Sequence, residues 1–129
     1  MTDDKIKEII NKTVATTVLQ LKAAGLLGNE SKNAFEKTEA LLYQYPKLKD
    51  LDEPYARRVV QEVEACLADV KNEPYVNVIS LYYFSGLSNV ACAMELMCDE
   101  RTCRRNRRKL VQQFAVRLAS DEFIRELLL

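Results

Sequence analysis

The amino-acid sequence predicts an all-α protein, with a helical N-terminal region at residues 1–71 and a second helical domain at residues 72–129. Two observations predict this class. Apolar residues recur three and four positions apart along almost every segment, which is the spacing of one face of an α-helix. No run of four or more residues alternates between apolar and polar in the manner of a strand with one face in solvent. Residues that cap or interrupt helices then divide the chain into its elements.

Three helices are expected in the N-terminal region. The first covers residues 5–21, where one apolar stripe is formed by Ile6, Ile10, Val14, Val18 and Leu21. The second begins near Ser31, and Pro46 ends it or follows it closely, because proline disrupts a helix interior. The third begins after Asp52-Glu53-Pro54, where a carboxylate can cap the helix and proline suits its first turn, and it extends to about Val70.

Four helices are expected in the second domain. A proline preceded by an acidic residue opens the first, and a glycine ends it; a serine caps the second. Acidic side chains in the first turn of the fourth complement its helix dipole. The expected ranges are 72–86, 88–97, 101–119 and 121–129, with Gly86 as the stop, Ser88 as the cap and residues 98–100 as the turn before the long helix.

Composition excludes several classes of function. The chain contains no histidine, which excludes a Ser-His-Asp triad, a Cys-His pair and an imidazole metal ligand. Three glycines are too few for a dinucleotide fingerprint or a phosphate-binding loop. No C-x-x-C pair is present, and we expect four reduced cysteines that pack like small apolar residues: Cys66, Cys92, Cys98 and Cys103. We therefore expect no enzyme, no cofactor and no metal site.

We also expect no signal peptide. A basic segment followed by an apolar run, which marks a signal peptide, is missing from the N-terminal residues. No apolar stretch approaches the roughly 20 residues that span a bilayer. We therefore expect a cytoplasmic protein that has no membrane partner.

The net charge of zero hides an uneven distribution of charge. Residues 1–98 hold 11 basic and 14 acidic side chains, whereas residues 99–129 hold 8 basic and 5 acidic ones. Six of the basic residues fall within the nine positions 101–109. Because the local field decides which partner a surface attracts, this segment is the candidate for binding an anionic polymer.

The phase of the long helix sorts these residues. At about 100° per residue, Cys103, Leu110 and Phe114 share the buried side. Arg107 and Asn106 lie near the edge of that side and need partners. The expected DNA-contacting residues project outward or flank the outward face, and they are Arg101, Thr102, Arg104, Arg105, Arg108, Lys109 and Gln112.

The short helix and the turn before this segment complete a helix-turn-helix pattern. Its expected inner positions are Val90, Cys92 or Ala93, Leu96, Cys98, Cys103 and Leu110. In such a motif the second helix enters the major groove of DNA, where arginine reads guanine and basic side chains neutralise phosphates. A basic run that is only a solvated helix face is the alternative, although six crowded cations repel one another at the helix end that disfavours positive charge.

Three stretches carry a resemblance to a known family. They are Tyr82-Tyr83-Phe84-Ser85-Gly86, Glu100-Arg101-Thr102-Cys103-Arg104-Arg105-Asn106 and residues 34–46. Residues 79–110 resemble the helix-turn-helix of sigma-factor region four. Over about residues 30–120 the chain is similar to the ArpU/RinA-like family of phage late-gene transcriptional regulators. The resemblance implies a phage or prophage protein that activates late genes in the cytoplasm of a bacterial host. It also implies DNA contacts by Arg101, Thr102, Arg104, Arg105 and Arg108.

We expect a sequence-specific DNA-binding transcriptional regulator whose partner is double-stranded DNA. Two other functions remain open: an adaptor that binds a sigma factor or RNA polymerase without reading DNA, and a small-terminase-like subunit that recognises phage DNA for packaging. A homodimer also remains open. Aromatic side chains at helical spacing are expected to pack in the core rather than stack on bases, and they are Tyr75, Tyr82, Tyr83 and Phe84.

Overall fold

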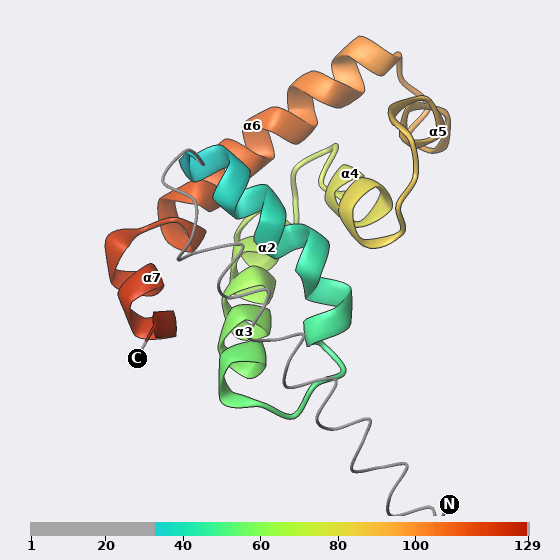
Figure 1. The fold of residues 1–129 in the computed structure, drawn as a ribbon. Helices are drawn as coiled ribbons and strands as arrows, with labels where there is room; N and C mark the ends of the chain where they lie inside the picture. The colour runs from blue at the N-terminus through green and yellow to red at the C-terminus, as the bar shows by residue number, and fades with distance from the viewer. Residues whose placement is uncertain (1–32, 129) are drawn as a thin grey trace, which may run out of the picture.

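The computed structural model describes residues 33–128, and no strand occurs in this part of the chain (Figure 1). The predicted all-α class is therefore confirmed. The helix expected at residues 5–21 lies outside the described residues. The elements are α2 (Ala34–Leu48), α3 (Pro54–Asp69), α4 (Asn77–Ile79), the π-helix η2 (Ser80–Phe84), α5 (Asn89–Glu95), α6 (Glu100–Leu118) and α7 (Asp121–Leu128).

Side-chain caps fix the starts of the main helices. The Glu53 carboxylate accepts a hydrogen bond from the backbone N–H of Ala56, and Pro54 occupies the first turn of α3. Ser88 caps α5 in the same way, as expected, and Asp99 caps α6. Each cap satisfies a backbone donor that the helix itself leaves free, which is worth about 1 kcal/mol. α2 begins at Ala34 after the cap Asn33, a little later than the expected start near Ser31.

Proline does not end α2, so that expectation is wrong. Pro46 lies inside the helix, which continues to Leu48. Proline removes one backbone hydrogen bond, but the following turn is still closed by the Lys49 N–H, which donates to the Tyr45 carbonyl at 2.9 Å. The Leu48 side chain is fully buried. Its burial, worth about 1.5–3 kcal/mol, favours one further turn over a break at proline.

The helix expected at residues 72–86 is also different in the structure. Residues 73–76 form turns, and the regular helix is limited to α4. η2 follows at once, and the Ser85 N–H donates to the Ser80 carbonyl five residues earlier at 2.9 Å. Gly86 ends the element with a φ of +73°, a left-handed conformation that glycine adopts without strain. The wider π turn brings Tyr83 into the core beside the partly buried Tyr82.

One hydrophobic core joins the described helices. α2 lies across α3 and α6, α4 and η2 pack against α2 and α6, and α5 packs on the N-terminal half of α6 (Figure 1). Both sides of the expected boundary between residues 71 and 72 contribute to this core. Its largest fully buried side chains include Leu41, Leu42, Leu48, Val59, Val63, Ile79, Val111, Phe114 and Leu118.

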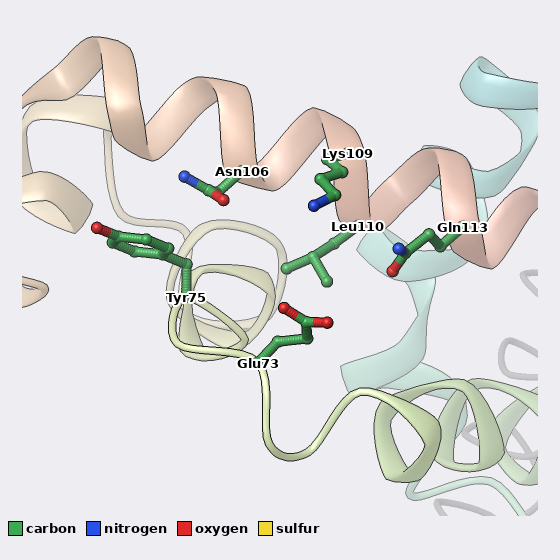
Figure 2. A pocket seen from close by; sticks show the side chains of 6 residues that line it. All are labelled: Glu73, Tyr75, Asn106, Lys109, Leu110 and Gln113. Atoms are coloured by element: carbon green, nitrogen blue, oxygen red, sulfur yellow. The ribbon is translucent and has the colours of Figure 1, made fainter.

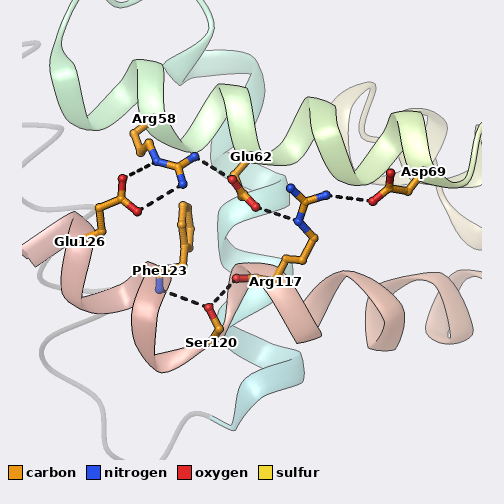
Figure 3. A network of polar contacts seen from close by, with 7 residues as sticks. All are labelled: Arg58, Glu62, Asp69, Arg117, Ser120, Phe123 and Glu126. Carbon is orange, nitrogen blue, oxygen red and sulfur yellow. Dashed lines mark hydrogen bonds and ion pairs between the residues drawn. The ribbon is translucent and has the colours of Figure 1, made fainter.

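A chain of ion pairs ties α3 to α6 and α7 (Figure 3). The Glu62 carboxylate lies 2.7 Å from Arg58 and 2.8 Å from Arg117. Arg58 also pairs with Glu126 of α7 at 2.7 Å, and its guanidinium lies over the ring of Phe123. α7 is therefore held by charge as well as by apolar packing, and α6 is fixed at its C-terminal end. None of the helices within residues 33–128 combines the length and the apolar character that crossing a membrane requires.

Candidate nucleic-acid interface

The turn between α5 and α6 has a defined backbone geometry. Beyond the last residues of α5, the N–H of Cys98 donates to the Ala93 carbonyl at 3.0 Å, and the N–H of Met97 donates to the Met94 carbonyl at 3.3 Å. These two bonds form a Schellman motif, which places one residue in the left-handed conformation. That residue is Met97, with a φ of 55° and a side chain that is 93% exposed. Methionine thus occupies the position that glycine usually takes.

Asp99 begins α6 and anchors its N-terminal turn. Its carboxylate accepts the N–H of Thr102 at 2.6 Å. This hydrogen bond lowers the pKa of the Asp99 carboxyl, and the nearby charges of Arg105 and Arg101 lower it further. Since the carboxylate stays ionised, it offsets part of the repulsion among the basic side chains of the next two turns.

The predicted contact residues occupy the solvent side of α6. Arg101, Arg104 and Arg105 are exposed in the first two turns, and Arg108, Lys109 and Gln112 are exposed in the next two, whereas Thr102 is half-buried. Arg104 forms an ion pair with Glu100. Within residues 33–128, no ion pair engages Arg101, Arg105, Arg108 or Lys109. The buried side is formed by Cys103, Leu110 and Phe114, as the helical phase predicts.

Arg107 turns inward and is only 8% exposed. Its guanidinium lies 4.0 Å from the centre of the Tyr82 ring, and its Nη1 donates to the Tyr83 hydroxyl at 2.9 Å. The same atom lies 3.4 Å from a carboxylate oxygen of Glu39 in α2. Burial disfavours the charged guanidinium, but the hydrogen bond to Tyr83 and the charge of Glu39 outweigh it and raise the pKa of Arg107. The sequence predicts that Arg107 needs partners, but nothing in it identifies Glu39, which is 68 positions away.

A cleft of about 330 Å³ lies along one flank of α6, and we name it the α6 cleft. Four elements contribute to it, although they are far apart in the sequence. Phe35 comes from the first turn of α2, and the Arg108 guanidinium lies 5.8 Å from the centre of its ring. Asn89, the first residue of α5, adds an amide. The lining residues are Phe35, Glu39, Tyr82, Asn89, Arg104, Arg107 and Arg108.

The other flank of α6 faces the loop before α4 (Figure 2). Glu73 and Tyr75 of this loop meet Asn106, Lys109 and Gln113 around the apolar side chain of Leu110. The enclosed space is about 10 Å³, which is the size of one water probe. The Asn106 amide donates to the Thr102 carbonyl one turn earlier in the same helix at 2.8 Å. The side chains on this flank are therefore closely packed, and the space between them is too small for a ligand.

All four cysteines lie within the described residues. Cys66, Cys92 and Cys103 are buried and Cys98 is partly buried, and all four are free thiols. Burial raises the pKa of Cys103 to about 11, so this thiol stays protonated and inert near neutral pH. No group of three possible ligands among residues 33–128 is arranged to hold a metal ion.

Val90 is not an inner residue, and that expectation is wrong. Its side chain is 54% exposed, and Met94, one turn later, is 75% exposed. The helix α5 is only seven residues long, and its buried residues are Cys92 and Ala93. At about 100° per residue, Val90 and Met94 fall on the opposite side of the helix from these two. Two exposed apolar side chains of α5, Val90 and Met94, and that of Met97 in the following turn form a set that we name the outer face of α5.

No protein-family model, curated protein or solved structure matches the chain. The resemblance to the ArpU/RinA-like regulators and to sigma-factor region four therefore stays a prediction. We name the exposed cations of α6 the basic surface; they are Arg101, Arg104, Arg105, Arg108 and Lys109. The function of the basic surface has to be inferred from these residues and their arrangement.

Proposed function

We propose that the chain is a sequence-specific DNA-binding transcriptional regulator in which α5 and α6 act as a helix-turn-helix and α6 is the recognition helix. One observation carries the proposal. Five exposed cations follow one another in the first three turns of a single helix, and only Arg104 has an ion-pair partner within the described residues. A surface that keeps so many like charges unpaired is suited to a polyanion.

The arrangement of these side chains fits the major groove. An α-helix enters this groove with its N-terminal residues closest to the bases, and the cations of α6 lie at that end. Arg101, Arg105 and Arg108 read bases or phosphates, while Thr102, Arg104 and Lys109 fix the helix on the backbone. Gln112 lies one turn farther along the exposed side and is suited to an adenine edge or a phosphate at the margin of the contact.

The rest of the chain favours a single orientation on DNA. Residues 1–98 carry three more acidic than basic side chains, so this part of the chain is repelled by the DNA phosphates that attract α6. This separation weakens nonspecific contacts made by other faces. The proposal extends to activation of late genes in a phage or prophage, which rests on the family resemblance of residues 30–120.

The experiment compares Arg105→Ala with Arg57→Ala. Arg57 is an exposed arginine on α3, remote from the basic surface, and it pairs with Asp52. Duplexes selected from a randomised pool by the wild-type protein serve as the probe. If Arg105 reads a guanine, its removal weakens binding by about 1–3 kcal/mol and relaxes the preference at one base pair. Arg57→Ala should bind like the wild type. Failure of the wild-type protein to enrich or retain any duplex at moderate salt would contradict the proposal.

A second candidate function is supported by the outer face of α5. Val90 and Met94 of α5 and Met97 of the following turn are exposed apolar side chains. Exposed methionines are common at protein-binding surfaces because the flexible thioether adapts to a partner. An adaptor for a sigma factor or RNA polymerase would use this face. Met94→Gln should then reduce retention of the polymerase holoenzyme and leave the affinity for DNA unchanged; an equal loss of both would contradict a separate protein-binding face.

A further inference from the structure

The α6 cleft is positively charged. Three arginines and one glutamate line it, which gives the lining a formal charge of +2. Arg107 is already engaged by Tyr83 and Glu39, so its charge contributes to the field but its Nη1 is occupied. Arg104 and Arg108 are both exposed, and they are the two arginines that can reach a ligand at the mouth of the cleft.

The existing partners of these two arginines are weak ones. Arg104 pairs with Glu100, but both side chains are substantially exposed, and such a pair contributes little because solvent screens it. Arg108 has an aromatic contact with Phe35 at 5.8 Å, which orients the guanidinium and leaves its N–H donors free for an anion. A phosphate could take the place of the Glu100 carboxylate and form a stronger, bidentate pair with Arg104.

Asn89 supplies a second type of donor at the same place. Its Oδ1 is buried and has no hydrogen-bond partner within the described part of the chain. The residue is not needed as a helix cap, because Ser88 accepts the N–H of Ala91 at 3.1 Å. An amide held beside two arginines, with its acceptor atom turned into the protein, is suited to donate N–H bonds to an oxyanion.

We propose that the α6 cleft binds one phosphate group of the DNA backbone, with Arg104, Arg108 and Asn89 as its donors. This inference rests on the proposed function, since it assumes that a duplex lies along α6. The cleft joins the starts of α2 and α5 to α6, so a phosphate bound there fixes the depth and the register of α6 in the groove. It adds a backbone contact, built from three helices and η2, to the base contacts made by α6 alone.

The test uses Asn89→Asp, which places a carboxylate beside Arg104 and Arg108 and repels a phosphate. Aspartate is favourable in the first turn of a helix, so α5 should stay folded. Gln61→Glu, on an exposed position of α3 outside the α6 cleft, makes the same change in net charge and is the matched control. Arg108→Gln is the second variant. Circular dichroism and urea unfolding establish that each variant is folded.

Binding to a short random-sequence duplex is measured over a range of salt concentrations. Asn89→Asp and Arg108→Gln should each bind about tenfold more weakly than Gln61→Glu, and the slope of log Kd against log salt should fall by about 0.9, the value for one lost phosphate contact. In parallel, inorganic phosphate is titrated while the side-chain amide signal of Asn89 is followed by NMR. This second arm separates a backbone phosphate from a free one.

The outcomes are distinguishable. Weaker duplex binding and a reduced salt slope for both cleft variants support the backbone phosphate. Unchanged duplex binding with a phosphate-dependent shift of the Asn89 signal overturns the backbone as the source and assigns the cleft to a free phosphate. Unchanged duplex binding with no shift overturns the phosphate site altogether. If the wild-type protein binds no duplex, the proposed function fails, and the phosphate titration alone then decides whether the cleft binds phosphate.

Discussion

The guanidinium of Arg107 in α6 donates to the hydroxyl of Tyr83 in η2 at 2.9 Å, and this hydroxyl donates in turn to Glu39 in α2 at 2.6 Å. Three elements are thereby joined by charge-assisted hydrogen bonds in a largely buried position. Because Arg107 is held on the inner side, the rotation of α6 about its axis is fixed. The neighbouring arginines, one and three positions away along the helix, are then directed into solvent or toward the α6 cleft.

Tyr83→Phe should destabilise the protein. The change removes the donor to Glu39 and the acceptor for Arg107, and leaves two partly desolvated charges less well paired. The expected loss in the free energy of unfolding is about 1–3 kcal/mol. Urea denaturation followed by circular dichroism measures it. Tyr75→Phe, at a half-buried tyrosine of the loop before α4, is the control and should change stability by less than about 0.5 kcal/mol. Equal effects of the two substitutions would contradict a special role for Tyr83.

Glu62→Gln should also destabilise the protein, through the junction of α3, α6 and α7 (Figure 3). The Glu62 side chain is 13% exposed and lies between Arg58 and Arg117, so its neutralisation leaves two guanidinium groups without their shared counter-ion. We expect a loss of about 1–2 kcal/mol in the free energy of unfolding, below the range for fully buried pairs because both arginines are partly exposed.

Glu126→Gln is the matched comparison for Glu62→Gln. Glu126 pairs with Arg58 as well, but its side chain is 53% exposed. Its substitution should therefore change stability by less than about 1 kcal/mol. Thermal and urea unfolding of the two variants in low and high salt measure the difference. A loss for Glu126→Gln as large as that for Glu62→Gln would show that burial of the shared carboxylate does not decide the effect.

The main helices were predictable because their signals are local. Glu53-Pro54 and Ser88 are adjacent in sequence to the turns that they cap, and the inner positions Cys103 and Leu110 follow from helical phase alone. The sequence predicts residues 98–100 only as a turn, and the structure adds Asp99 as the cap of α6. The expectation for Pro46 failed because the burial of Leu48 is a tertiary effect. The expectation for residues 73–84 failed for a related reason. A π-helix and an α-helix have the same local sequence preferences, and the wider turn is favoured here because it lets Tyr83 reach Glu39.

The candidate site was predictable to a similar depth. The exposed side of α6 follows from periodicity, so Arg101, Arg105 and Gln112 could be placed on it from the sequence. The α6 cleft could not be predicted from the sequence, because Phe35 and Asn89 approach Arg108 only through the packing of α2 and α5 on α6. Neither residue carries a sequence signal for binding. Contacts between positions far apart in the chain need a fold before they can be recognised.

Met97→Gly should stabilise the protein. Met97 has a φ of 55°, a conformation that costs residues with a side chain about 1–2 kcal/mol, and glycine adopts it freely. Glycine also gains freedom in the unfolded chain, so the expected net increase in the free energy of unfolding is about 0.5–1 kcal/mol. Met94→Gly is the control, because Met94 lies in the α5 helix and the same substitution there should destabilise by a similar amount. Urea denaturation of both variants should give changes of opposite sign.

Several tyrosines should titrate late, and stability should fall at alkaline pH. Burial, together with hydrogen bonding to Glu64, raises the pKa of Tyr45 from 10.0 to about 12, and burial raises the pKa of Tyr55 to about 12. A raised tyrosine pKa means that the folded state keeps a proton that the unfolded state releases. The stabilisation is therefore fully present below pH 10 and is lost as the pH rises from 10 toward 12.

Absorbance of tyrosinate at increasing pH, recorded with circular dichroism, tests this prediction. In the folded protein the absorbance should rise in two phases, with the late phase coinciding with loss of helicity. Tyr45→Phe should reduce the late phase and make unfolding less steep with pH between 10 and 12, since one group that couples proton release to unfolding is gone. A single titration centred near pH 10, with full helicity retained, would contradict the burial of these hydroxyl groups.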